Sequence, residues 1–337
     1  MSTNATAIRT APKSGLQHFR DERLSLVIKV AKLYHESQIR QSEIAERLNL
    51  SQSKVSRLLH QAETSGLVRT IVVSPEGLYS DIELALAGRY GLLDAVVAEP
   101  LADDEATLLA ALGSAGAVYL AETLAPNERI GISSWSSALL ATVSSMAPPA
   151  TVKLADDIVQ VIGGVGRPDV QVQANYLAGQ LAAVTGGTAH FFPAPGLVGS
   201  REARDALMND SYIGQLLPQW DGLTTLLLGI GALHPSRLLV SSGNSVGDSE
   251  AEVLGRLGAV GDVCLRFFDA DGNHLASAID SRVVGIDVDR LRSVPRRVGV
   301  AGGERKYAAI RGAILGGWVN VLVTDRETAV RLLEDER

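Results

Sequence analysis

The chain has little of what several classes of protein require. Its 337 residues include one cysteine, Cys264, so no disulfide can form within the chain. That cysteine lies in the apolar run 263–268, which predicts a buried strand and an unreactive thiol. We see no apolar run near the ~20 residues of a membrane span and no apolar signal segment at the N-terminus. We therefore expect a cytoplasmic protein that does not bind a membrane.

Residue patterns for metals and nucleotides are missing too. The six histidines show no ligand spacing to one another or to Cys264. The segment GIGALHP at 229–235 lacks the third glycine of a dinucleotide fingerprint, and the glycines at 163–166 do not match a phosphate-binding P-loop. We expect neither a metal nor a cofactor.

Charge is distributed unevenly along the chain. The formal net charge is −7, yet residues 1–70 contain 11 Lys and Arg against 6 Asp and Glu. This segment therefore carries +5, and the remaining residues carry −12. A basic module on an acidic protein is typical of a chain that binds a polyanion through one part alone.

The basic segment contains a pair of short amphipathic helices. In the stretch 41–59, QSEIAERLNLSQSKVSRLL, apolar residues recur at helical spacing on both sides of a polar turn, and Ser51 is suited to cap the second helix. The apolar faces are formed by Ile44, Ala45 and Leu48 in the first helix, and by Val55, Leu58, Leu59 and Ala62 in the second. The opposite face of the second helix is polar and basic, as a helix that enters the DNA major groove requires.

An ordinary helical hairpin with a solvated polar face would show the same period. Three further features favour a helix-turn-helix that binds double-stranded operator DNA: an apolar stripe over 24–34 that predicts a third helix, Gly66 at the end of the second helix, and the segregated charge. Residues 68–73 predict a strand that would form a small wing. The candidate DNA-binding residues are Gln41, Ser42, Ser51, Gln52, Ser53, Lys54, Ser56 and Arg57.

Composition divides the chain into four parts. Residues 1–20, rich in small polar residues, predict a disordered tail. A small all-α, winged helix-turn-helix domain is expected over 21–74, and the breakers Ser74-Pro75-Glu76-Gly77 predict a linker over 75–80. The remaining residues, 81–337, form a large domain.

The large domain alternates apolar runs with helical segments. This alternation predicts an α/β fold with a mostly parallel, Rossmann-like sheet covered by helices. The expected strands are 93–98, 129–132, 158–162, 189–192, 225–228, 263–267, 298–300 and 319–323. The expected helices are 81–90, 105–123, 136–146, 172–184, 202–208, 250–257, 304–315 and 326–333.

Loops rich in glycine, serine or aspartate follow six of these strands. The carboxyl ends of parallel strands are where open α/β sheets bind small ligands. The loop 133–137 offers four serine hydroxyls at the start of a helix, and Gly302 and Gly303 allow close backbone approach near the cation of Lys306. A glycine after a strand is more often part of a turn than part of a ligand site. We predict a site for a phosphate or a polyhydroxylated ligand because several such loops share one edge of the sheet.

The order of motifs resembles the SorC family of bacterial sugar-responsive transcription regulators. The motifs are the helix-turn-helix SEIAERLNLSQSKVSRLL, GIS at 131–133, VIGG at 161–164, GIGA at 229–232, GAVGD at 258–262, AGG..K at 301–306 and NVLVTD at 320–325. The resemblance implies a C-terminal effector-binding and oligomerisation domain related to sugar-phosphate isomerases, assembly as a homo-oligomer (dimer or tetramer), and a sugar, polyol or sugar-phosphate effector.

The resemblance also implies which residues form the effector site. They are Ser133, Ser134, Trp135, Ser136, Ser137, Gly163, Gly164, Pro195, Gly229, Asp269, Gly302, Gly303 and Lys306. The family commonly has the pattern SWG.T in the first of these loops, whereas this chain has Ser134-Trp135-Ser136-Ser137-Ala138. Without that glycine the backbone fits a phosphate less closely, so a free sugar or polyol is an alternative to a phosphosugar.

A second hypothesis is a sugar-phosphate isomerase or deaminase that carries a DNA-binding module. Such an enzyme needs a positioned base, for which Asp269 and Asp271 are the candidates. The segment Asp-Ala-Asp-Gly-Asn is equally a polar turn, and no second catalytic carboxylate or histidine stands beside it in the sequence. We therefore expect a regulator and not an enzyme.

Overall fold

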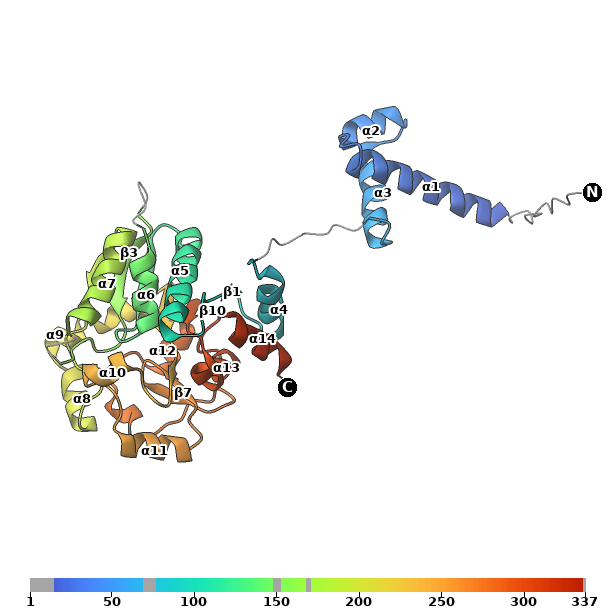
Figure 1. The fold of residues 1–337 in the computed structure, drawn as a ribbon. Coiled ribbons are helices and arrows are strands. Elements are labelled where there is room, and N and C mark those ends of the chain that lie inside the picture. Colours follow the sequence, from blue (N-terminus) through green and yellow to red (C-terminus); the bar gives the residue numbers. More distant parts are fainter. Residues whose placement is uncertain (1–14, 69–76, 148–152, 168–170, 336–337) are drawn as a thin grey trace, which may run out of the picture. The chain divides into compact units, whose positions relative to one another are not determined.

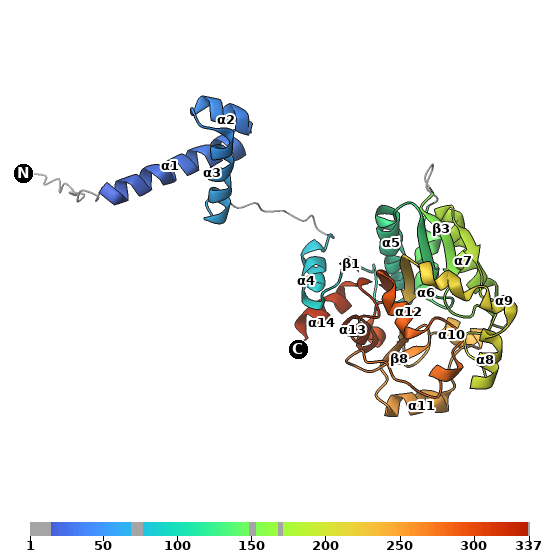
Figure 2. The same ribbon diagram turned by 180° about the vertical axis from the view of Figure 1, so that it is seen from behind.

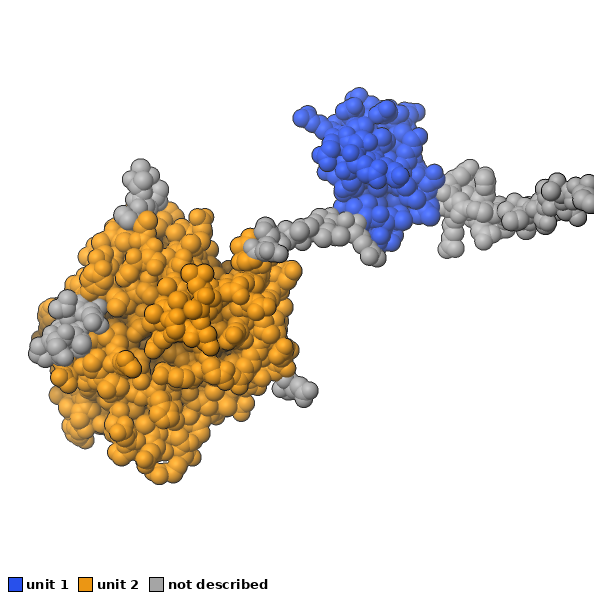
Figure 3. Space-filling view, in the orientation of Figure 1, with its two compact units in different colours: residues 1–73 blue, residues 74–337 orange. Residues whose placement is uncertain are grey.

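The chain divides into two compact units, residues 1–73 and 74–337 (Figure 3). The computed structural model describes residues 15–68, 77–147, 153–167 and 171–335, with the backbone alone over 15–23 and 171–173. The expected boundary after residue 74 lies beside the division between the units. The expected wing strand, apart from Val68, and the first linker residues lie outside the described part of the chain.

The N-terminal unit contains three helices around a small apolar core. They are α1 (Gly15–His35), α2 (Gln41–Arg47) and α3 (Gln52–Thr64). The residues predicted to share the inner faces of α2 and α3 are buried, apart from the half-buried Leu48, and they pack against Val27, Val30 and Ala31 of α1. The prediction that residues 15–20 belong to a disordered tail is wrong, because α1 begins at Gly15. No proline or glycine interrupts residues 16–35, so nothing stops the helix from extending toward the N-terminus.

The turn between α2 and α3 has the geometry of a helix-turn-helix. Asn49 adopts a left-handed conformation with φ 51°, and the backbone N–H of Leu50 bonds to the carbonyl of Ala45 at 2.8 Å. The Ser51 side chain caps α3 by accepting a hydrogen bond from the Lys54 N–H at 3.3 Å. After α3, Gly66 takes φ 72°, as expected for the glycine that follows a helix end.

The C-terminal unit is built on seven parallel strands in the order β1-β10-β9-β5-β2-β3-β4 (Figure 1). The strands are β1 (Asp94–Ala98), β2 (Glu128–Ile132), β3 (Ala155–Gln160), β4 (Thr188–His190), β5 (Thr225–Gly229), β9 (Arg296–Val300) and β10 (Val321–Asp325). The predicted parallel α/β sheet is confirmed. Alternate residues of each strand face opposite sides, so Leu227 joins one core while Leu226 and Leu228 join the other.

Helices cover both faces of this sheet. On one face α5, α6 and α7 lie side by side (Figures 1 and 2), and their apolar residues form a core with Ile130, Leu227 and Val298. The helices of the unit are α4 (Ser80–Tyr90), α5 (Glu105–Thr123), α6 (Ser137–Ser145), α7 (Gln171–Thr185), α8 (Arg201–Met208), α9 (Ser211–Gly214), α10 (Arg237–Ser242), α11 (Asp248–Arg256), α12 (Val288–Ser293), α13 (Tyr307–Leu315) and α14 (Arg326–Glu334). The short helices α9, α10 and α12 were not expected from the sequence, because four to six residues are too few to show a helical period.

The segment predicted as one buried strand over 263–267 is instead a hairpin. A second, antiparallel sheet is formed by β6 (Gly231–Ala232), β7 (Gly261–Val263) and β8 (Arg266–Phe268). Cys264 and Leu265 make the turn between β7 and β8 with positive φ angles of 53° and 60°. The thiol is nevertheless buried, and burial raises its pKa to about 12, which agrees with the unreactive cysteine that we expected.

The helix α5 is apolar all round. By length and composition it is the one helix in the described ranges that would suffice to cross a membrane, so the expectation of no such run is wrong for residues 105–123. Its charged residues are confined to its ends, and alanine, leucine and glycine make up most of the rest. One side packs on α6, where a side chain at Gly113 or Gly116 would collide with Ala141 or Thr142.

Candidate functional site

The outer face of α3 presents the residues expected to meet DNA. Ser53, Lys54, Ser56 and Arg57 are exposed, whereas Val55 between them is fully buried. The Arg57 Nε donates to the Ser53 carbonyl at 3.3 Å, which lays the side chain along the helix. The other candidates, Ser42, Ser51 and Gln52, are exposed, and Gln41 is half-buried.

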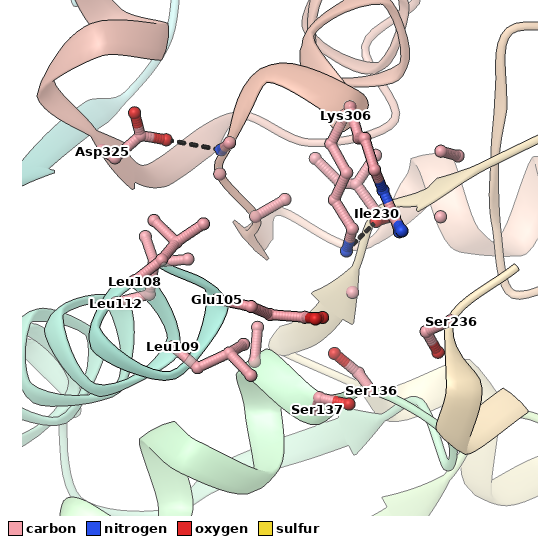
Figure 4. Close-up of a pocket in the computed structure, with 18 of the residues that line it drawn as sticks. Glu105, Leu108, Leu109, Leu112, Ser136, Ser137, Ile230, Ser236, Lys306 and Asp325 are labelled. Carbon is pink, nitrogen blue, oxygen red and sulfur yellow. Dashed lines mark hydrogen bonds between the residues drawn. The ribbon is translucent and has the colours of Figure 1, made fainter. Parts of the chain in front are cut away.

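A cavity of about 570 Å³ opens at the carboxyl edge of the parallel sheet. Loops that follow β1, β2, β5, β9 and β10 line it, as does the first part of α5 (Figure 4). Strands β2 and β5 are neighbours in the sheet. After β2 the chain continues to β3, toward one edge of the sheet, and after β5 the next strand of this sheet is β9, toward the other edge. Such a reversal of strand order leaves a crevice between the two loops, which is where open α/β sheets bind ligands.

The serine-rich loop after β2 uses most of its polar groups internally. The Ser134 hydroxyl donates to the Ile162 carbonyl at 2.9 Å, and Ser133 accepts from the Gly229 N–H at 3.3 Å. The Trp135 indole donates to the Gly163 carbonyl at 3.2 Å. Ser133 and Ser134 are buried, whereas the half-buried Ser136 and Ser137 reach the ligand space in Figure 4, so the loop offers two hydroxyls there instead of the expected four.

Glycines let two pairs of loops approach each other closely at the cavity. A side chain at Gly229 would lie 2.5 Å from the Ser136 hydroxyl, and one at Gly302 would lie 2.4 Å from an oxygen of Asp325. Gly303 has φ 89°, a conformation that other residues rarely adopt. The Asp325 carboxylate caps α14 and accepts from the Gly303 N–H at 2.7 Å, so it fixes the loop at the cavity wall.

The half-buried Lys306 and the buried Asp262 place opposite charges at the cavity. The Lys306 ammonium donates to the Ile230 carbonyl at 2.8 Å (Figure 4). Its burial lowers its pKa, against the opposing influence of Asp262 and Glu105. Burial raises the pKa of Asp262 to about 6, although its carboxylate accepts from the Leu265 N–H at 2.9 Å and lies near Lys306.

Nine of the thirteen residues assigned to the effector site line the cavity, and four do not. Gly163, Gly164 and Pro195 belong to the loops after β3 and β4, toward the far edge of the sheet. Their backbones pack against one another, since a side chain at Gly163 would lie 2.3 Å from Pro195. Asp269 follows β8 and does not line the cavity, and its carboxylate accepts hydrogen bonds within its own turn.

The structure adds residues that the sequence reasoning passed over. Asp262 lines the cavity. So do Glu105, Asp325, Ser236 and the apolar side chains Leu108, Leu109 and Leu112 (Figure 4). The loops after β1 and β10 contain no glycine pair, so they lacked the signal that marked the others. Asp325 carried a usable signal, because an aspartate between an apolar strand and a helix is a capping residue.

The chain combines a helix-turn-helix unit with an α/β unit, and the α/β unit has a ligand-sized cavity where its strand order reverses. This combination defines a two-domain regulator that binds DNA and a small molecule. Residues 76–334 match the family model described as "Putative sugar-binding domain". The chain belongs to the SorC family of sugar-responsive transcription regulators, and it is a DNA-binding transcriptional regulator that responds to a sugar-type effector.

Curated relatives and a solved structure agree with this assignment over nearly the whole chain. The chain is 32% identical over 314 residues to the deoxyribonucleoside regulator of Bacillus subtilis, covering 93% of this chain and 99% of the relative. It is 31% identical over 318 residues to the sorbitol operon regulator of Klebsiella pneumoniae, covering 92% and 98%. The full-length crystal structure of that regulator superimposes with a TM-score of 0.69 at 29% identity, over 93% of this chain and 100% of that one.

The raised pKa of Asp262 predicts a pH-dependent stability. A carboxyl whose folded pKa, about 6, exceeds its unfolded value contributes stability below about pH 4, which is lost as the pH rises through 6. Asp262→Asn keeps an oxygen for the Leu265 N–H but cannot ionise. The free energy of unfolding of this variant, relative to that of the parent protein, should rise by about 1–3 kcal/mol as the pH increases from 4 to 7.5.

Urea unfolding followed by tryptophan fluorescence measures this difference, because all three tryptophans lie in the α/β unit. Asp269→Asn is the matched control, because the pKa of Asp269 is shifted in the opposite direction. Burial would raise that pKa, but hydrogen bonds from Asn273 and Asp271 outweigh it and lower the pKa. If Asp262→Asn changed stability equally at both pH values, the buried ionised carboxylate would be wrongly assigned.

Proposed function

We propose that the cavity holds a sugar, polyol or sugar-phosphate effector and that its occupancy controls operator binding by α3. The observation that carries this proposal is the convergence of Ser136, Ser137, Lys306 and Glu105 on one ligand-sized space at the reversal of strand order. Hydroxyl, ammonium and carboxylate groups together suit a molecule rich in hydroxyls. The relatives' names, which refer to a sorbitol operon and to deoxyribonucleosides, support the same class of effector.

The control operates through linkage between two binding events. Two or more helix-turn-helix units, held together by associated α/β units, bind repeated half-sites on operator DNA. An effector can shift operator occupancy only by its different affinity for DNA-competent and DNA-incompetent arrangements. A regulator of this kind works where the chromosome is, so we place it in the cytoplasm.

We further propose that the effector is bound and not converted. The relatives are named as regulators. The base considered from the sequence, Asp269, uses its carboxylate to accept from the N–H groups of Asp271 and Asn273 at 3.0 and 2.8 Å. It therefore serves the polar turn, away from the cavity.

Substitution at the two sites should separate the two binding events. Arg57→Ala removes a guanidinium from the exposed face of α3 and should weaken operator binding by about 1–3 kcal/mol while effector affinity stays unchanged. Lys306→Ala removes a charged donor from the cavity and should weaken effector binding by about 1.5–3 kcal/mol while operator affinity without effector stays unchanged.

Fluorescence anisotropy with labelled operator DNA and calorimetry with the effector measure the two affinities. Lys29→Ala, an exposed basic residue on α1, is the matched control for general loss of charge. Operator affinity unchanged in Arg57→Ala would show that α3 does not dock through this face. Effector affinity unchanged in Lys306→Ala would place the ligand elsewhere.

We propose that the chain forms a homo-oligomer, a dimer or tetramer, and that the outer side of α5 contributes to the contact. Ala110, Ser114, Val118 and Ala121 recur along that side and are exposed, with 61% of Val118 accessible. An apolar helix of this kind is normally covered on all sides, and small residues let a second helix approach closely. A second copy is the natural cover, because two half-sites require two DNA-binding units.

Val118→Glu should therefore shift the protein toward smaller species by placing a charge in the contact. Sedimentation equilibrium at micromolar concentration measures the change in mass. Val253→Glu on α11, where 44% of the valine is exposed, is the matched control and should leave the mass unchanged. An unaltered mass in Val118→Glu would rule out this side of α5 as the contact.

A further inference from the structure

The cavity assigned to the effector contains more negative than positive charge. Among the described residues that line it, eight side chains are carboxylates and three are Lys or Arg. Two of those carboxylates, Glu105 and Asp262, act directly on the charge of Lys306. Figure 4 shows Glu105 extending from α5 into the space between Lys306 and Ser136. The ammonium of Lys306 is therefore partly compensated before any ligand enters, although its desolvation still lowers its pKa.

Some of the hydrogen-bonding groups that a phosphoryl group would need already have partners in the protein. The Ser136 hydroxyl caps α6 by accepting from the Leu139 N–H at 3.3 Å, so an anion at this helix end would compete with it. The Ser134 hydroxyl donates to a backbone carbonyl, and so does the Lys306 ammonium. One N–H group at the helix start that the sequence marked as a phosphate cradle is thus already capped by the protein itself.

The same groups suit hydroxyls better than they suit a phosphoryl group. An ionised carboxylate only accepts hydrogen bonds, and each sugar hydroxyl has a proton to donate. Glu105 and Asp262 can take such protons, while Lys306 can share its remaining protons with ligand oxygens. A phosphate dianion has no proton to offer, and its charge would be repelled by both carboxylates.

We propose that this cavity selects a free sugar or polyol over the corresponding phosphate ester, with Glu105 and Asp262 accepting protons from the ligand hydroxyls. The proposal rests on the effector site proposed above and names the class of molecule that the site prefers.

Calorimetric titration of the full-length protein with matched pairs tests this selection. The probes are pentoses, hexoses and their polyols, sorbitol and deoxyribose among them, each paired with its monophosphate ester. We expect at least one free sugar or polyol to bind and its ester to bind at least tenfold more weakly. An ester that binds within tenfold of its parent, or more tightly, overturns the selection and leaves the effector site standing. If no member of any pair binds, the effector site itself is overturned.

The variant Glu105→Gln tests the physical cause. It removes one negative charge at nearly constant size, so the affinity ratio of free compound to ester should fall at least tenfold. Glu122→Gln, an exposed residue in the last turn of the same helix, is the matched control and should leave the ratio unchanged. Circular dichroism shows whether both variants keep their fold. An unchanged ratio in a folded Glu105→Gln protein overturns the role assigned to Glu105.

Discussion

The parallel pairing of β2 with β5 is the constraint on which the ligand site depends. Ile130 pairs with Thr225 and Ile132 with Leu227, yet the chain reaches β3 and β4 on one side of this pair and β9 and β10 on the other. The loops that leave β2 and β5 must therefore diverge. The Ser133 hydroxyl and the Gly229 N–H hold their first residues together, and the cavity opens just beyond.

Much of this arrangement could be predicted from the sequence, because the signals involved are local. The helix over 105–123 starts and ends where it was expected, and Asp104 caps it with hydrogen bonds to two N–H groups. The hairpin around Cys264 could not be predicted, because two three-residue strands read like one apolar run. That error also misplaced Asp269. The orientation of Glu105 into the cavity depends on how α5 packs across the sheet, which no pattern within the helix reveals.

Both binding surfaces are ready before their ligands arrive, but for different reasons. The face of α3 is exposed because Val55, Leu58 and Leu59 bury the opposite side of the helix. The cavity instead keeps a lysine and two carboxylates in partial balance, at the cost of burying Asp262 with a raised pKa. A ligand whose hydroxyls meet those carboxylates relieves this cost. Ligand binding can shift the equilibrium between two arrangements of the oligomer only if the ligand binds one arrangement more tightly than the other.

The most direct measurement of this account is a binding cycle with one compound that binds the cavity. Its affinity is measured by calorimetry with the free protein and with the protein saturated by operator DNA, and operator affinity is measured with and without the compound. Linkage predicts that both affinities change by the same factor, typically 5- to 150-fold. A compound that binds with identical affinity in the presence and absence of operator DNA would contradict the claim that the cavity controls the helix-turn-helix.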